Sequence, residues 1–175
     1  MDKLMSNLHF KFLSLGYKFR DLRSRETILK EVNIKPGDHV LDFGCGPGSY
    51  ILPVAKMVGE SGKVYALDIQ PMAIESVRKI IKRESLQNVE SILSGHETGL
   101  PDESVDVVLL YDTFHSFCDP GPILQELHRV LHPEGILSFS DHHLTGDEII
   151  SKITQKKMFD LKQKGDKTYS FKKVK

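Results

Sequence analysis

The sequence VLDFGCGPGS, residues 40–49, places three glycines at alternate positions directly after a short apolar run. Gly44, Gly46 and Gly48 have no Cβ, so the backbone can turn sharply there and a ligand can approach it closely. A helix that begins after such a loop presents free N–H groups and a partial positive charge, which favour an anionic group. Asp42, at the end of the apolar run, can accept a hydrogen bond from an ammonium group or from an N–H of the loop. The pattern is typical of a loop that holds a nucleotide-like ligand.

A second carboxylate, Asp68, ends the next apolar run of the chain, 24 residues beyond Gly44. At that place a carboxylate can accept hydrogen bonds from both hydroxyls of a ribose. The dinucleotide fingerprint G-x-G-x-x-G needs a glycine at the position of Ser49, so the sequence argues against a nicotinamide-dependent oxidoreductase. The alternative is a glycine turn that only closes the packing of a strand on a helix. Three glycines with two carboxylates exceed what packing requires.

Apolar runs alternate with amphipathic segments from residue 39 onward, which predicts alternating strands and helices. The predicted strands are 39–43, 64–68, 89–93, 105–111 and 136–140, followed by a terminal hairpin with strands over 158–162 and 168–174. The predicted helices are 3–15, 21–32 with Asp21 or Ser24 as its cap, 49–58, one opened by Pro71, one from Pro122 to a turn at 132–135, and one begun by a capping box at Thr145–Glu148. This alternation indicates right-handed βαβ units and a parallel sheet, whose ligands bind outside the carboxyl ends of the strands.

Length and composition favour one ordinary globular domain. The chain has 175 residues, of which 39% are hydrophobic and 27% are charged, and this usage argues against whole-chain disorder. Two cysteines, Cys45 and Cys118, are too few for a disulfide framework or a Cys-rich zinc module. The sequence shows neither the ~18-residue apolar stretch of a membrane span nor the apolar core of a signal peptide. We therefore expect a cytoplasmic protein without a membrane span.

The charges balance overall but are unevenly placed along the chain. Lysine and arginine together number 24, as do aspartate and glutamate. Residues 1–35 carry a surplus of four positive charges and residues 152–175 a surplus of seven, so the middle of the chain is acidic. Both basic ends are expected to be solvated faces that dock on the acidic body. Attraction of an anionic partner is the alternative.

The chain resembles class I S-adenosylmethionine-dependent methyltransferases, in particular the small ubiquinone-biosynthesis-like (methyltransferase type 11) branch. The resemblance is carried by VLDFGCGPGSY, VYALDIQ, the Gly-Leu-Pro turn ahead of SVDVVLLYDTFHS, and ILQELHRVLHPEGILSFSD, over about sixty per cent of the chain. It implies an α/β, Rossmann-like, doubly wound sheet of seven strands in the order 3-2-1-4-5-7-6, mostly parallel with strand 7 antiparallel. Within this single domain it implies a helical cap over the substrate side at 1–35, a cofactor-binding core at 36–141, and a last helix with an edge hairpin at 142–175.

The resemblance also implies the cofactor, S-adenosylmethionine, with S-adenosylhomocysteine as its product. Asp42 and the glycine loop would hold the methionine end of the cofactor, and Asp68 would hold its ribose. Tyr111 and Asp112 would border the methionine part. The glycines assigned to the loop are Gly44, Gly46 and Gly48.

Three residues are assigned to the adenine by the same resemblance. Ile69 would pack on the ring, and His96 with Glu97 follow the third strand, where the family reads the adenine edge. The family usually has an aspartate at the position of His96. A neutral imidazole accepts a hydrogen bond through one nitrogen, and Glu97 is adjacent, so the assignment is kept. A surface loop histidine is the alternative.

A sulfonium methyl group is already an activated electrophile, so the protein supplies binding, orientation and charge placement. If the acceptor is a hydroxyl, a general base helps. His115, after the fourth strand, is the residue assigned to catalysis, because the family often places a histidine there; a packing histidine is the alternative. Asp141, His142 and His143 after the fifth strand are further candidates, and Tyr17 near the N-terminus is a weaker one.

A metal ion is the remaining question at these strand ends. Asp112, Asp141 and His142 could converge on a divalent cation, as in metal-assisted O-methylation of vicinal diols. Carboxylates and imidazoles also gather at strand ends without a metal, and no single element carries a ligand spacing. We therefore assign no metal site.

The resulting hypothesis is a methyltransferase that acts on a small-molecule acceptor. A non-catalytic cofactor-binding module or accessory subunit is the first alternative, because little chain is inserted after the fifth strand to cover a substrate. An RNA or other anionic substrate is the second, because of the basic ends. DNA is not expected, since base-amino methyltransferases of this fold carry an Asn/Asp-Pro-Pro-aromatic run where this chain has YDTF at 111–114. The acceptor and the oligomeric state stay open.

Overall fold

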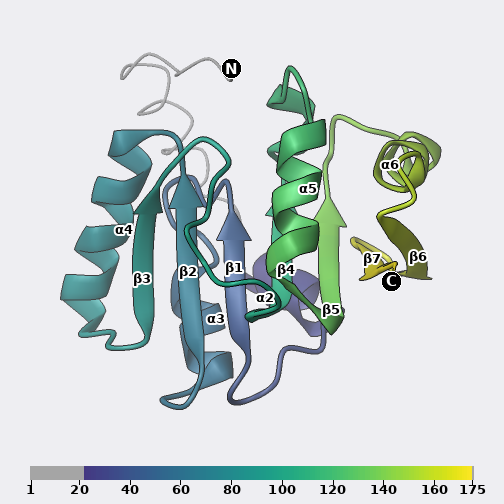
Figure 1. The fold of residues 1–175 in the computed structure, drawn as a ribbon. Helices are drawn as coiled ribbons and strands as arrows, with labels where there is room; N and C mark the ends of the chain where they lie inside the picture. The colour runs from purple at the N-terminus through teal and green to yellow at the C-terminus, as the bar shows by residue number, and fades with distance from the viewer. Residues whose placement is uncertain (1–21, 175) are drawn as a thin grey trace.

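Seven strands with intervening helices make up residues 22–174, the part of the chain that the computed structural model describes (Figure 1). The strands are β1 (His39–Phe43), β2 (Lys63–Asp68), β3 (Val89–Leu93), β4 (Val105–Tyr111), β5 (Leu131–Ser140), β6 (Phe159–Lys164) and β7 (Tyr169–Lys173). The helices are α2 (Leu22–Lys30), α3 (Ile51–Val58), α4 (Pro71–Glu84), the short 3-10 helix η1 (Phe114–Ser116), α5 (Gly121–Val130) and α6 (Gly146–Thr154). The predicted helix over 3–15, Asp21 and Tyr17 lie outside the described residues.

The strands form one sheet in the order β3-β2-β1-β4-β5-β7-β6. Strands β1 to β5 pair in parallel, and β7 pairs antiparallel with both β5 and β6. The predicted strand order and the antiparallel seventh strand are confirmed. The order reverses between β1 and β4, so the loops that follow these two strands flank the place where such sheets bind ligands.

Helices cover both faces of the sheet and bury two hydrophobic clusters. Helices α5 and α6 pack over one cluster, and α2, α3 and α4 over the other. Figure 1 shows α5 in front of the sheet and α3 behind it. Successive residues of β1 divide between the clusters, Val40 on one face and Leu41 on the other, because side chains alternate along a strand. This two-sided burial explains why β4, in the middle of the sheet, is apolar almost throughout.

Element boundaries depart from the sequence prediction in a few places. Helix α2 begins at Leu22, so Ser24 lies inside it and is not its cap. Strand β5 begins at Leu131, so the expected turn at 132–135 is part of the strand. The reason is that Leu131 is fully buried and pairs with Val105, and the residues after it form an irregularity in the register. The capping box at Thr145–Glu148 is present as predicted. None of the helices within residues 22–174 is long and apolar enough to cross a membrane.

Candidate cofactor site and active site

The glycine loop after β1 is built from left-handed backbone, with φ of +79° at Gly44, +52° at Gly46 and +86° at Gly48. A Cβ on Gly44 would lie 2.6 Å from Oγ1 of Thr113, and one on Gly48 would lie 2.8 Å from Cδ1 of Ile80. Both glycines therefore let the loop pack closely against the end of β4 and against α4. A Cβ on Gly46 would meet no atom of the described residues within 4 Å. Of the three glycines, Gly46 is the one that borders open space.

Asp68 ties this loop to the end of β2. Its Oδ2 accepts the N–H of Gly46 at 2.8 Å, and its Oδ1 accepts the N–H of Gln70 at 2.7 Å. Burial raises the pKa of the Asp68 carboxyl, while these backbone donors act to lower it. Each carboxylate oxygen retains a second lone pair. The group thus orders the loop and can still accept from a hydroxyl of a ligand.

Asp42, in β1 just before the loop, is a buried acid with unused hydrogen-bonding capacity. Its side chain is buried, and its Oδ2 has no hydrogen-bond partner among the described residues. Burial, and then repulsion from Asp68, raises the pKa of Asp42 to about 7. A buried carboxylate oxygen without a donor is costly. The arrangement fits a cationic group or an N–H donor supplied by a ligand.

The residues predicted for the adenine lie at the next strand ends. Ile69 follows β2 directly and is half-buried, and a Cβ on Gly95 would lie 3.6 Å from its Cδ1. The N–H of Ser94 donates to the carbonyl of Asp68 at 3.1 Å, which holds the loop after β3 against the end of β2. His96 and Glu97 follow in that loop, and both are exposed. The structure thus brings the loop of the predicted adenine residues beside Asp68.

The loops after β4 and β5 are joined by two histidine–carboxylate contacts, which we call the crossed pairs. His142 of the β5 loop donates its backbone N–H to Oδ1 of Asp112 in the β4 loop at 3.2 Å, and its Nδ1 lies 2.7 Å from the same oxygen. His115 of the β4 loop donates its N–H to Oδ2 of Asp141 in the β5 loop at 3.0 Å. The Nδ1 of His115 lies 3.0 and 2.9 Å from the two Asp141 oxygens. Because β4 and β5 end side by side in register, each loop supplies one partner to each pair.

The crossed pairs also bear on the question of a metal. Ligand atoms of Asp112, Asp141 and His142 lie within 4.8 Å of one another, so the structure brings these three residues together. Asp141 accepts the N–H groups of His143 and His115, each at 3.0 Å. Since N–H donors already meet these carboxylates, we describe the group as a hydrogen-bonded cluster, and a metal site stays unassigned.

Comparison with known proteins gives the family. A family model described as "Methyltransferase domain" matches residues 34–173. The chain belongs to this family of methyltransferases. It is 34% identical over 113 residues to a demethylmenaquinone methyltransferase of Lactobacillus johnsonii. The aligned region covers 63% of the chain and 46% of that relative. It is 32% identical over 141 residues to a demethylmenaquinone methyltransferase of Listeria welshimeri. Here the aligned region covers 80% of the chain and 56% of that relative. The chain therefore spans about half the length of these curated relatives.

Among solved structures, the chain is similar to a SAM-dependent methyltransferase from Aquifex aeolicus, with 28% identity and a TM-score of 0.78. The likeness covers 95% of this chain and 97% of that one. The class I methyltransferase family inferred from the sequence motifs is thus confirmed by both sequence and fold.

Not every residue predicted for the site of this methyltransferase-family chain offers a polar group to a ligand. Tyr111 is buried, its hydroxyl lies 2.7 Å from Oγ of Ser138, and its ring packs on Tyr50 with centroids 5.2 Å apart. Burial raises the pKa of Tyr111 above its usual range. The hydroxyl is therefore committed to the core, and only the ring of Tyr111 can border the methionine part.

Two further residues were not recognised from the sequence in the roles that the structure gives them. Thr113 packs against Gly44 and so shapes the loop, and Asp141 is the partner of His115. A signal for Asp141 exists, because it follows its strand as Asp42 and Asp68 end theirs. No comparable signal in the sequence distinguishes Thr113.

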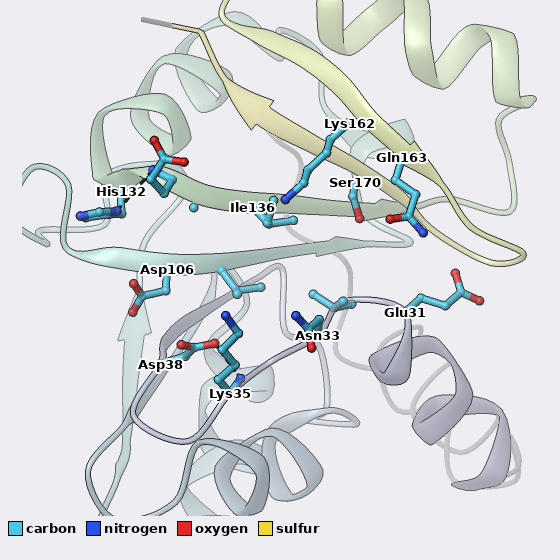
Figure 2. Close-up of a pocket in the computed structure, with 14 residues that line it drawn as sticks. Glu31, Asn33, Lys35, Asp38, Asp106, His132, Ile136, Lys162, Gln163 and Ser170 are labelled. Carbon is cyan, nitrogen blue, oxygen red and sulfur yellow. Dashed lines mark hydrogen bonds between the residues drawn. The ribbon is translucent and has the colours of Figure 1, made fainter.

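A polar cavity of about 420 Å³ lies elsewhere on the molecule, between the 31–38 segment and strands β4 to β7. Figure 2 shows its charged side chains, with Lys35 and Asp38 facing Lys162 across it. Asp106 and His132, near the starts of β4 and β5, also line it. Ligands of parallel sheets bind at the carboxyl ends of strands, and none of the predicted cofactor residues lines this cavity. We do not assign the cofactor to it.

Proposed function

We propose that the chain transfers a methyl group from S-adenosylmethionine to a small-molecule acceptor. The observation that carries the proposal is the buried Oδ2 of Asp42, beside the loop where Gly46 borders open space. A ligand that is cationic at one end and carries a ribose at the other satisfies both Asp42 and Asp68. The names of the relatives, demethylmenaquinone methyltransferases and a SAM-dependent methyltransferase, support the same reading.

Different residues would bind successive parts of such a cofactor, from its methionine end to its adenine. Asp42 would take the ammonium of the methionine part, and the N–H groups of the glycine loop would take its carboxylate. Asp68 would accept from the ribose hydroxyls with its remaining lone pairs. Ile69 would pack on the adenine, with His96 and Glu97 at its edge. When bound, the cofactor supplies an activated methyl group, so these residues need only bind and orient it.

Isothermal titration of the full chain with S-adenosylhomocysteine tests this proposal. We expect saturable binding that Asp68→Ala weakens by roughly 1.5–3 kcal/mol, the range for a charge-assisted hydrogen bond. Asp160→Asn removes a carboxylate from the exposed side of β6 and is the matched control for lost charge. An absence of saturable binding at millimolar ligand overturns the proposal. Unchanged affinity in Asp68→Ala shows instead that the ribose is held elsewhere.

A non-catalytic binding module would give the same titration but no methyl transfer. The distinction therefore depends on residues that face the acceptor rather than the cofactor. The crossed pairs lie at the ends of β4 and β5, next to the glycine loop through the contact of Thr113 with Gly44.

A further inference from the structure

The polar cavity of about 420 Å³ is separate from the candidate cofactor site. Within its lining, Asp38 precedes β1, and Asp106 and His132 lie near the starts of β4 and β5. Asp42 and Asp68 of the cofactor site lie near the ends of β1 and β2 instead. Because these strands run parallel, their starts and their ends lie at opposite edges of the sheet. A ligand of the cavity is therefore a different molecule from the cofactor.

Both shifts in strand register within residues 22–174 lie at this cavity. Between β4 and β5 the register shifts around Asp106, where residues 132–135 of β5 form an insertion opposite it. His132 and Glu134 of this insertion line the cavity together with Asp106. Bulges interrupt strand pairing and redirect side chains, and they are common beside active sites. The sheet is thus irregular where it forms the wall of the cavity.

The second irregularity is a bulge at Lys162, between β6 and β7. Leu161 pairs with Phe171 and Gln163 pairs with Ser170, so no residue of β7 pairs with Lys162. Successive side chains of a regular strand point to opposite faces, yet Lys162 and Gln163 both line the cavity. The bulge therefore adds a charged side chain to a wall that regular pairing would have left with only one of the two.

Glu31, which follows α2, joins the N-terminal wall of the cavity to the hairpin that carries Lys162. Its Oε2 accepts the N–H of Thr168 at 3.0 Å and the hydroxyl of Thr168 at 2.9 Å. The N–H of Lys167 lies 3.2 Å from both oxygens of the same carboxylate. These contacts fix the two walls relative to each other before a ligand binds, which lowers the entropy lost on binding.

Lys35 and Lys162 extend into the cavity from opposite walls (Figure 2). Neither Nζ has an ion pair or a hydrogen bond with any of the residues that the structure describes. Two ammonium groups at one cavity repel each other, and an anion between them turns this repulsion into attraction. Asn33, Gln163 and Ser170 add amide and hydroxyl donors to the same lining. A phosphate group, with three strong acceptor oxygens and close to two negative charges, matches these donors.

Two carboxylates of the lining have acceptor oxygens to spare. Oδ2 of Asp38 accepts the N–H of Lys35 at 2.8 Å, and Oδ2 of Asp106 accepts the N–H of His39 at 2.8 Å. Within residues 22–174 the Oδ1 atom of each has no hydrogen-bond partner. A carboxylate oxygen accepts readily from a hydroxyl and repels a second anion. The part of a ligand that meets Asp38 and Asp106 is therefore expected to carry hydroxyl groups.

We propose that this cavity binds a phosphorylated polyol of the sugar-phosphate class. Its phosphate lies between Lys35 and Lys162, and its hydroxyls donate to Asp38 and Asp106. Small-molecule pockets measure about 300–1,000 Å³, so a cavity of about 420 Å³ accommodates one sugar ring with its phosphate. The surplus of positive charge over residues 152–175 favours the approach of such an anion. The site does not depend on the proposed methyl transfer.

NMR titration of the isotope-labelled, cofactor-free full chain with glucose 6-phosphate tests the proposal, in a buffer without phosphate. Because Lys35 and Lys162 are exposed, we expect saturable binding with millimolar affinity. The amide signals that move should be those of residues 33–38 and 162–170, while the signal of Gly46 stays in place. Glucose without a phosphate should cause no saturable change. An absence of saturation with glucose 6-phosphate, or changes centred on Gly46, overturns the proposal.

Two lysine variants distinguish a built site from general attraction to a basic surface. Lys162→Ala should weaken the binding of glucose 6-phosphate about tenfold, through the loss of one charge-assisted contact. Lys172→Ala is the matched control, because it removes an exposed lysine of β7 that does not line the cavity, and it should leave the affinity nearly unchanged. An equal loss in both variants indicates diffuse attraction, as for an RNA or another polyanion, and overturns the site.

Asp38→Asn tests the placement of the hydroxyl groups. The amide keeps an oxygen for the N–H of Lys35, but it lacks the charge that repels phosphate and strengthens a bond from a hydroxyl. The variant is titrated with inorganic phosphate and with glucose 6-phosphate. We expect inorganic phosphate to bind more tightly than to the wild type, and the preference for glucose 6-phosphate over inorganic phosphate to fall about threefold. An unchanged preference overturns the role of Asp38.

Discussion

Replacing Asp42 by asparagine should stabilise the fold at neutral pH and weaken cofactor binding at the same time. The folded-state pKa of Asp42 is raised from 3.8 to about 7 by burial and by Asp68. Below pH 3.8 the carboxyl is protonated in both the folded and the unfolded chain, so it adds no penalty. As the pH rises towards 7 the unfolded chain loses the proton first, and this destabilises the fold increasingly until the penalty levels off above pH 7.

The size of the effect follows from the same shift. Each unit corresponds to about 1.4 kcal/mol, so the full penalty is about 4 kcal/mol at pH 8 and about 1 kcal/mol at pH 4.5. Urea unfolding of the wild type and Asp42→Asn at the two pH values measures it. The comparison across pH cancels any constant packing cost of the amide. We therefore expect the unfolding free energy of Asp42→Asn, relative to that of the wild type, to be about 3 kcal/mol more favourable at pH 8 than at pH 4.5.

Ligand binding should respond in the opposite sense. A bound ammonium favours ionised Asp42, so wild-type affinity for S-adenosylhomocysteine should rise about tenfold from pH 6 to pH 8. Asp42→Asn should bind more weakly and show no such rise. A stability difference that does not change with pH, or an affinity that stays flat in the wild type, would refute the reasoning about this carboxylate.

Four other substitutions address single contacts. Gly46→Ala should cost only about 1 kcal/mol in thermal unfolding, the cost of left-handed backbone, yet reduce ligand affinity, whereas Gly44→Ala should lower the melting temperature strongly because its Cβ has no room. Ser138→Ala leaves the buried Tyr111 hydroxyl without its partner and should cost about 1–3 kcal/mol in urea unfolding. Thr145→Ala removes the cap of α6 and should cost about 1 kcal/mol, measured in the same way. Equal melting temperatures for the two glycine variants, or wild-type stability in either of the others, would contradict these contacts.

The sequence determines the sheet better than it determines the site. Buried strands that alternate with amphipathic helices predict the parallel sheet, and the family motifs supply the strand order. The start of β5 escapes prediction because a proline and a glycine at 133 and 135 usually end regular structure, and only the pairing of Leu131 with Val105 shows that the strand has already begun.

Within the site, residues close to each other in sequence were easier to assign than pairs that the fold creates. The glycines and Asp42 belong to one continuous segment, so their proximity is visible in the sequence. His115 and Asp141 are 26 residues apart, and their contact depends on where two strands end and on how Phe114 packs. Tyr111 is a residue for which the sequence suggests more than the structure supports. A tyrosine at a strand end suggests a polar contact with a ligand, but its hydroxyl forms a hydrogen bond with Ser138 instead.

The reciprocal arrangement of the crossed pairs has a mechanical consequence. Each loop contains one carboxylate that contacts the histidine of the other loop. Neither loop can therefore move away from the other unless both histidine–carboxylate contacts break. The two loops should consequently move together as one unit whenever this end of the sheet opens, and loss of one attachment should leave the other still joining them.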